Sequence, residues 1–377
     1  MKIRTLTIGV SLSEDDFYSY EEHSGTSINL VEVKLRRAIA TLRSVSMPLS
    51  EARYEVQTLR VSLNSFEQWL NSKDGDENLN RLRQLDNVLA SLDIVMCSIG
   101  NCQASSSLLL VPSYLSISAR FSCSFSVTNY GSGSLADFDR CLKAAETILS
   151  VGKISEDGLR NFSFCASFNC PPNVPFFPAS YHDESKAPTI TVGLESGDLL
   201  FLSFHGAETF AEAKSNLFLT LSQVLMPLQK LLELACIEND VIYGGIDASI
   251  NPGLTPQDSV GAGLEILGPH YFGHAGTMAA VAVITSTLNS LRASDSLKII
   301  GYSGLMLPIV EDLQLAQRAS ESPSSFTIRD LVAYSSVCGV GLDTVPIPGD
   351  SSPESIAWIM MDLGAISFRQ NKPLTCR

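Results

Sequence analysis

Five short loops in the last third of the chain combine glycine or proline with side chains that could do chemistry. Carboxylates, an imidazole, a thiol and hydroxyls occur in them, beside apolar stretches typical of strands or helices. Ligands of α/β proteins collect at the carboxyl ends of such strands. We therefore expect these loops to meet in one polar recess. They are Gly244–Ser249, Gly273–Thr277, Gly301–Gly304, Cys338–Asp343 and Pro346–Asp350.

Four side chains from these loops form a candidate catalytic set. Asp247 and His274 are residue types that act as a general acid/base pair. Cys338 is a candidate nucleophile or proton donor, and Asp343 a carboxylate that orients its neighbours. Acid/base chemistry of this kind contributes about 10²–10⁴-fold in rate.

Substrate would be held by backbone N–H groups and polar side chains. Gly276 and Thr277 open a helical pattern, where free N–H groups suit an oxyanion. A small polar or anionic metabolite is therefore the expected ligand. The predicted substrate-binding residues are Ser249, Gly276, Thr277, Ser303, Gly304, Glu311 and His182.

Each of these residues also has a purely structural interpretation. His274 is of a type that often forms structural hydrogen bonds, and Cys338 of a type that often packs as a small buried apolar group. Thr277 could cap its helix, and Glu311 and Asp312 could complement a helix dipole. The recurrence of such groups in neighbouring loops is what favours a site.

Known catalytic motifs are absent, and a metal site is only loosely indicated. The patterns GxGxxG, GxxxxGK[ST], HExxH and GxSxG do not occur. Asp247, Asp343, Asp350 and His274 together would suit Mg²⁺, Mn²⁺ or Ca²⁺ better than Zn²⁺. A divalent cation is thus a candidate cofactor, with Asp247 and Asp350 as its candidate ligands.

Strand and helix patterns alternate along the chain and predict an α/β fold. Strands are expected over 2–10, 54–63, 94–98, 120–127, 161–168, 241–246 and 296–300, and helices over 79–92, 136–149, 207–236, 256–267, 277–291, 311–319 and 330–337. A last helix is expected after Ser351, with Glu354 completing a capping box and Pro353 in the first turn.

We predict one large domain. It consists of an N-terminal half, 1–206, a long helical connector, 207–240, and a motif-rich C-terminal half, 241–377. The proline-rich segment 171–178 between the predicted strands suits a rigid connector, or a loop that lines a cleft with Tyr181 and His182 at its end.

Composition limits the function classes. The chain has 377 residues, is 45% apolar and 18% charged, and carries a net charge of −14. Such a chain can bury a sizeable core, and its negative charge disfavours nucleic-acid binding. We expect no membrane span, and we expect its nine cysteines to be reduced and buried in a cytoplasmic protein. The low charge favours self-association into a homo-oligomer.

The sequence also resembles a known family, the domain of unknown function 711 family. The resemblance covers most of the chain and is densest after Val241. It is carried by VIYGGIDASINPG, FGHAGTMAA, GYSGLMLPIVEDLQLAQRA, VCGVGLDTVPIPGD and the ending NKPLTCR, with KIRTLTIGVSL, YEVQTLRVSLN, VPFFPASYH and TVGLESGDL earlier in the chain. Members are expected to continue for some tens of residues past the KPLT-type motif.

The resemblance implies a barrel. The family is similar in fold to the α/β barrel of the pyruvate formate-lyase-like glycyl-radical enzymes, in which a cysteine on an interior loop does radical chemistry. Cys338 would be that cysteine by analogy. The RVxG-type radical glycine is missing, because Ser62 and Leu63 follow Arg60 and Val61, and fold similarity alone does not carry function. Radical catalysis is therefore not predicted.

Three functions remain open from the sequence. The first is an enzyme, of the lyase or hydrolase type, that acts on a small anionic metabolite by acid/base chemistry. The second is a protein that binds a metal or ligand without turnover. The third is a structural oligomer in which the polar loops are only turns.

Overall fold

The computed structural model describes residues 2–21, 27–268, 271–294 and 296–377. Ten strands form one sheet in the order β10-β9-β1-β5-β6-β7-β8-β12-β11, with β4 paired to β1. The strands are β1 Lys2–Val10, β4 Glu55–Val56, β5 Leu59–Leu63, β6 Met96–Cys102, β7 Phe121–Thr128, β8 Phe164–Phe168, β9 Thr189–Glu195, β10 Ile242–Asp247, β11 Gly341–Leu342 and β12 Leu374–Cys376.

The sheet contains groups of parallel strands that run in opposite directions. Strands β1, β5, β6, β7 and β8 are parallel to one another. The pairs β9·β10 and β11·β12 are also parallel, but they join the first group through antiparallel contacts, β1·β9 and β8·β12. The carboxyl ends of β9–β12 therefore lie beside the amino ends of β1 and β5–β8.

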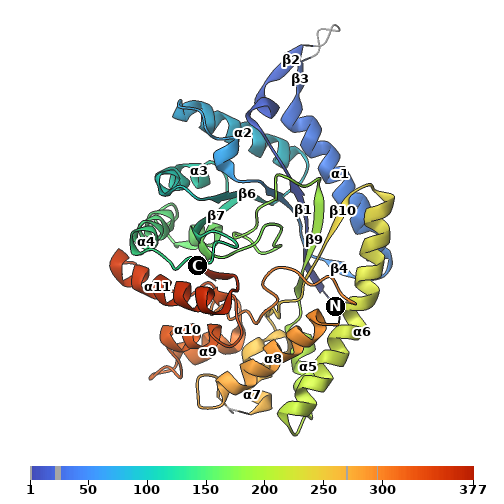
Figure 1. The fold of residues 1–377 in the computed structure, drawn as a ribbon, viewed down its shortest axis with the longest axis vertical. Helices are drawn as coiled ribbons and strands as arrows, with labels where there is room; N and C mark the ends of the chain where they lie inside the picture. Colours follow the sequence, from blue (N-terminus) through green and yellow to red (C-terminus); the bar gives the residue numbers. More distant parts are fainter. Residues whose placement is uncertain (1, 22–26, 269–270, 295) are drawn as a thin grey trace.

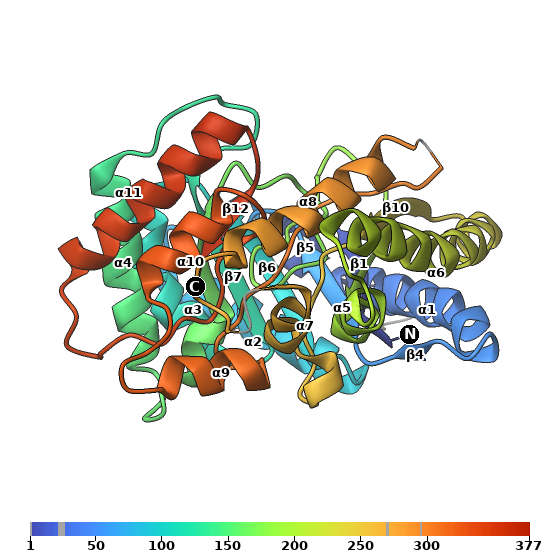
Figure 2. The same ribbon diagram turned by 90° about the horizontal axis from the view of Figure 1, so that it is seen from below.

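Helices surround the strands in both views (Figures 1 and 2). A short ribbon of β2 Ser19–Glu21 and β3 Ser27–Asn29 projects beyond them at the top of Figure 1. The helices are α1 Leu30–Glu51, α2 Gly75–Ser91, α3 Val111–Ile117, α4 Phe138–Gly152, α5 Gly197–Phe204, α6 Phe210–Glu238, α7 Val260–Leu267, α8 Thr277–Arg292, α9 Leu313–Ser320, α10 Ile328–Ser335 and α11 Pro353–Gln370.

The two faces of the sheet belong to different clusters of buried side chains. In β8, Phe164 and Ala166 join the main core, whereas Cys165 belongs to a second, smaller cluster. Because side chains alternate along a strand, this second cluster lies on the opposite face. Its other members come from 170–179 and from the loops after α8 and α10: they are Cys170, Val174, Ala179, Tyr302, Met306 and Val340.

The predicted α/β class is confirmed. The sheet runs from β10 at one end to β11 at the other, and these two strands are not paired with each other in the described residues, so the sheet is not closed and the predicted barrel is not confirmed. The predicted strand 296–300 appears as a single bridge between Ile299 and Ile246. The last helix is capped by Ser352 rather than Ser351, since the Ser352 Oγ accepts the Ser355 N–H at 3.2 Å.

One helix in the described part of the chain, α6, is long and apolar enough to cross a membrane. The apolar window of α6 is 28% buried, and the helix contacts α1, α5 and α8 through one face. Its fully buried leucines recur every three or four residues, at Leu217, Leu221, Leu225, Leu228 and Leu232. All nine cysteines are free and buried, as the composition predicts.

Candidate functional site

A cavity of about 250 Å³ opens where the opposed strands meet. The amino ends of β1, β5 and β6 contribute Arg4, Thr5, Arg60 and Met96. The carboxyl ends of β9–β12, or the residues just after them, contribute Gly193, Leu194, Asp247, Asn251, Asp343 and Arg377. The remaining lining residues are Phe162, Pro175, Phe176, Phe177, Met306, Pro308 and Glu311.

Two arginines and two acids in this cavity form a chain of ion pairs. Glu311 lies between the two guanidinium groups: one carboxylate oxygen contacts Arg4 and the other lies 3.3 Å from Arg377 Nη2. Arg377 also donates from Nε and Nη2 to Asp343 Oδ1, at 3.0 and 2.5 Å. These four side chains neutralise one another in charge.

Arg60 is the third cation of the cavity, and its charge is not neutralised in this way. Its Nε donates to the Thr58 hydroxyl at 2.9 Å, and its guanidinium lies 5.1 Å from the centre of the Phe177 ring. No carboxylate pairs with it among the described residues. Burial, and then repulsion from Arg4 and Arg377, lowers the pKa of Arg60 to about 9, and the more weakly acting charge of Glu311 opposes this only in part. The side chain remains charged at neutral pH, and an anion would relieve this cost.

The two aspartates in the cavity have different surroundings. Asp247, at the end of β10, accepts the N–H groups of Ser249, Tyr302 and Ser303 and the Ser249 hydroxyl at 2.5–3.0 Å. Asp343 accepts both bonds from Arg377 on Oδ1, and Oδ2 has no partner among the described residues. Burial raises the pKa of both carboxyl groups. Asp343 is therefore the better placed for proton transfer, because it keeps a free oxygen.

The proline-rich segment supplies part of an aromatic wall. Pro175, Phe176 and Phe177 all line the cavity, whereas Tyr181 and His182 do not. The Arg377 guanidinium lies 5.4 Å from the ring centre of Phe176 and 5.1 Å from that of Phe162. Cation–π contacts of this kind hold guanidinium groups in place without neutralising their charge.

The structure brings together three of the residues predicted from the sequence: Asp247, Glu311 and Asp343 line the cavity. Three more of the predicted residues do not line the cavity but hold the loop that contains Asp247: they are Ser249, Ser303 and Gly304. The Ser249 hydroxyl donates to Asp247 and accepts the Gly304 N–H at 3.2 Å, and the Ser303 hydroxyl accepts the Ala248 N–H at 3.1 Å.

Cys338 is not brought to the cavity. Its side chain is 3% exposed, and its sulfur accepts the Leu305 N–H at 3.2 Å. Burial raises the pKa of the thiol, which keeps it protonated at neutral pH. In this setting Cys338 connects the loop after α8 with the loop after α10.

The loop that contains His274 also lies away from the cavity. His274 and Gly276 are exposed, and the imidazole stacks on Tyr271 with ring centres 5.3 Å apart. The buried Thr277 hydroxyl accepts the Gly273 N–H at 3.1 Å, which closes the loop at the start of α8. These residues therefore do not join Asp247 in the structure.

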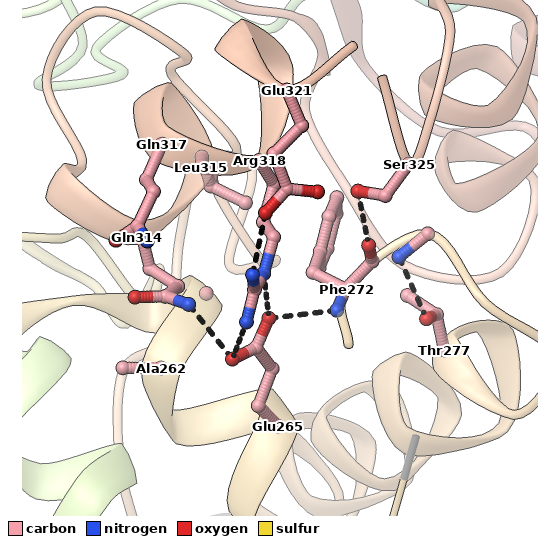
Figure 3. Close-up of polar contacts among 12 residues, drawn as sticks. Ala262, Glu265, Phe272, Thr277, Gln314, Leu315, Gln317, Arg318, Glu321 and Ser325 are labelled. Carbon is pink, nitrogen blue, oxygen red and sulfur yellow. Dashed lines mark hydrogen bonds and ion pairs between the residues drawn. The ribbon is translucent and has the colours of Figure 1, made fainter. Parts of the chain in front are cut away.

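A polar network anchors that loop, and Figure 3 shows its centre, Glu265. The Glu265 carboxylate accepts two bonds from Arg318, at 2.7 and 3.0 Å, one from Gln314 and one from the Phe272 N–H, each at 2.8 Å. Arg318 also pairs with Glu321 at 2.6 Å. Both side chains of the main pair are nearly buried, so the network links α7, α9 and the loop before α8.

Glu265→Gln should destabilise the protein by about 2 kcal/mol, because it removes a nearly buried bidentate pair while Glu321 still compensates Arg318 in part. Denaturant unfolding monitored by circular dichroism measures this loss. His274→Ala, in the exposed part of the same loop, is the control and should change stability by less than about 0.5 kcal/mol. Equal effects of the two substitutions would contradict this assignment.

The remaining predicted residues lie apart. His182 is buried, with its ring nitrogens 2.9 Å from Asn173 Oδ1 and 3.3 Å from the Lys186 carbonyl oxygen, and burial lowers its pKa. Asp350 is exposed in a turn before α11. Within the described ranges, no three His, Cys, Asp or Glu side chains converge in a way that could hold a metal ion.

Sequence reasoning missed the three arginines. Arg4 and Arg60 each lie within an apolar strand pattern, where a charged residue is unusual unless it faces a partner or a ligand. That was the available signal for both. Arg377 offered no such signal, because it follows a strand of only three residues, β12.

Comparison with known proteins gives relatives of unassigned function. The chain is 31% identical to a UPF0210 protein of Pyrobaculum arsenaticum over 57% of this chain and 48% of that protein. A UPF0210 protein of Syntrophobacter fumaroxidans is 26% identical over the whole chain and 85% of its own length, and one of Acetivibrio thermocellus is 25% identical over the same shares. The chain spans about half the length of the two Pyrobaculum relatives that it matches.

The family model described as Uncharacterised ACR (DUF711) matches residues 1–377. This range includes the loops that place Asp247, Glu311 and Asp343 around the cavity. The resemblance seen in the sequence is thereby confirmed at the level of the family: the chain belongs to the DUF711 family, whose curated relatives are named UPF0210 proteins.

Proposed function

We propose that the cavity binds a small organic anion and that Asp343 transfers a proton to or from it. The observation that carries this proposal is Arg60, a partly buried guanidinium that lines the cavity with no described carboxylate partner. Charged groups in protein interiors are normally paired. An incoming carboxylate or phosphate would supply the missing partner.

The size and lining of the cavity support a small ligand. About 250 Å³ is below the usual range of roughly 300–1,000 Å³ for pockets that hold drug-sized molecules. Aromatic, methionine and proline side chains make up seven of the seventeen lining residues and would contact the carbon body of the ligand. Asp247, whose oxygens are occupied by backbone and serine donors, serves to fix the loop after β10.

We also propose that the fold is barrel-like and related to the pyruvate formate-lyase-like barrel, as the resemblance implies. Contacts between the two ends of the sheet support a barrel-like arrangement. Residues 299–305, after α8, continue the sheet next to β10 through two bridges, Ile246 with Ile299 and Ile250 with Leu305. The Leu305 N–H then contacts the Cys338 sulfur, three residues before β11. An irregular segment thus connects the two ends of the open sheet around the second cluster of buried residues.

Proton transfer can be tested by hydrogen exchange. In D₂O, the full chain should accelerate the exchange of the C3 protons of 2-oxobutyrate, followed by proton NMR. Asp343 would accept the proton on Oδ2 and return a deuteron. The rate should fall at acidic pH as Asp343 becomes protonated, with a midpoint above the usual value for aspartate of about 3.9, because burial raises its pKa.

Asp343→Asn should remove the acceleration of hydrogen exchange. Asp350→Asn is the same change seven residues later in the sequence, at an exposed position outside the cavity, and it should retain the acceleration. Saturation-transfer NMR reports in the same samples whether the acid binds. If the acid binds but its hydrogen exchange is not accelerated, the protein binds a ligand without turnover and the proposed proton transfer is wrong. Acceleration that survives Asp343→Asn would exclude Asp343 as the proton-transfer group.

A further inference from the structure

We propose that the ligand of this cavity is an organic acid with a single negative charge, and that Glu311 excludes ligands with two. This inference rests on the proposed function and adds the substrate class. It makes Glu311 a specificity-determining residue that discriminates through charge.

The pairing of charged groups around the cavity supports a ligand with one anionic group. Three guanidinium groups line it, from Arg4, Arg60 and Arg377. Glu311 contacts the first and the last of these, and Asp343 contacts the last as well. Asp247 already accepts hydrogen bonds from the loops after β10 and α8. Arg60 is thus the one cation of the cavity, among the described residues, without an ion pair.

The geometry of Glu311 makes it an obstacle to a second anionic group. Its two carboxylate oxygens are divided between Arg4 and Arg377, so neither guanidinium can turn to a ligand without losing this contact. A second carboxylate on the ligand would also meet the negative charges of Glu311 and Asp343. Like charges held close together oppose binding and thereby provide specificity.

The rest of the lining suits an apolar body rather than another charge. Phe162, Phe176, Met96, Met306 and Pro308 line the cavity, which is therefore suited to hydrocarbon. A ligand with one carboxylate and a short carbon chain fits this lining. Its carboxylate would bind Arg60, and its carbon chain would contact the apolar side chains.

The test compares butyrate with succinate, which has the same number of carbons and one more carboxylate. Binding to the full chain is measured by titration calorimetry at a pH where both carboxyl groups of succinate are ionised. The wild type should bind butyrate at least about tenfold more tightly. Glu311→Gln frees the guanidinium of Arg4 and leaves Arg377 paired with Asp343 alone. It should lower the ratio by about tenfold or more.

Glu321→Gln is the matched control, because it also removes one carboxylate from an arginine, Arg318, in the network of Figure 3. It should leave the ratio unchanged. Circular dichroism of each variant shows whether it is folded. Equal or tighter binding of succinate by the wild type, or an unchanged ratio in folded Glu311→Gln, would overturn the role of Glu311 but not the anion site. No binding of either acid would overturn the anion site itself and this inference with it.

Discussion

Arg60→Gln should abolish the binding of butyrate by the cavity while the protein stays folded. Truncating one partner of a desolvated, charge-assisted contact costs about 2–5 kcal/mol, which corresponds to a loss in affinity of roughly 30- to several-thousand-fold. Glutamine keeps a donor near the Thr58 hydroxyl, the one hydrogen bond that the Arg60 side chain makes in the described structure. Titration calorimetry on the folded variant measures the loss.

The stability of the same variant separates a ligand site from a structural arginine. Burial and the neighbouring arginines lower the pKa of Arg60, which means that the folded protein disfavours its charge. Removing that charge should therefore leave the free energy of unfolding unchanged or raise it. Arg36→Gln, at an exposed pair with Glu32 on α1, is the control and should keep full affinity. A strongly destabilised Arg60→Gln variant, or one that still binds butyrate, would contradict the role given to Arg60.

The part of the site that could be predicted consists of acids at the ends of strands. Asp247 is the last residue of β10 and Asp343 follows β11, and glycine-containing motifs mark both positions in the sequence. The cations were missed because the loops were assumed to follow parallel strands. The antiparallel pairing of β1 with β9 brings the amino ends of β1 and β5, with Arg4 and Arg60, to the same place. This pairing joins residues far apart in the chain and leaves no local pattern.

Local motifs could not distinguish a site from a well-formed turn. Glycines next to His274 and Cys338 predict close turns, and the structure contains such turns at both places. Whether a turn faces a cavity depends on the packing of the helices around it. His274 stacks on an exposed tyrosine, whereas Cys338 packs inside the protein, and the two loops have the same kind of sequence.

Long periodic elements were predictable, and short ones were not. The strand 2–10 and the helices near 277–291 and 207–236 agree closely with β1, α8 and α6, because each contains enough repeats to show its period. The strands β11 and β12, of two and three residues, are defined only by their partners. Tertiary contacts, rather than the propensity of the residues, therefore determine that strands form at the edge of the sheet where Asp343 and Arg377 lie.

Asp312→Ala should be the most destabilising of the substitutions considered, with a loss of about 4 kcal/mol. The sequence suggests that Glu311 and Asp312 are equivalent acids near a helix start, but the structure separates them. The buried Asp312 carboxylate accepts the Ser259 hydroxyl at 2.7 Å, and it also accepts N–H groups at the starts of two helices, Val260 of α7 at 2.7 Å and Leu315 of α9 at 2.9 Å. Leaving each of these buried donors without an acceptor costs about 1–3 kcal/mol.

Denaturant unfolding of the full chain measures the effect of Asp312→Ala, with Asp330→Ala as the comparison. Asp330 caps α10 at an exposed position through its bonds to Thr327, so water can replace it and the loss should be only about 1 kcal/mol. Similar losses in the two variants would show that Asp312 acts only as an ordinary cap. A larger loss for Asp312→Ala would show that one carboxylate holds α7 and α9 together, which fixes the chain next to Glu311 and thereby the acid that we propose excludes doubly charged ligands.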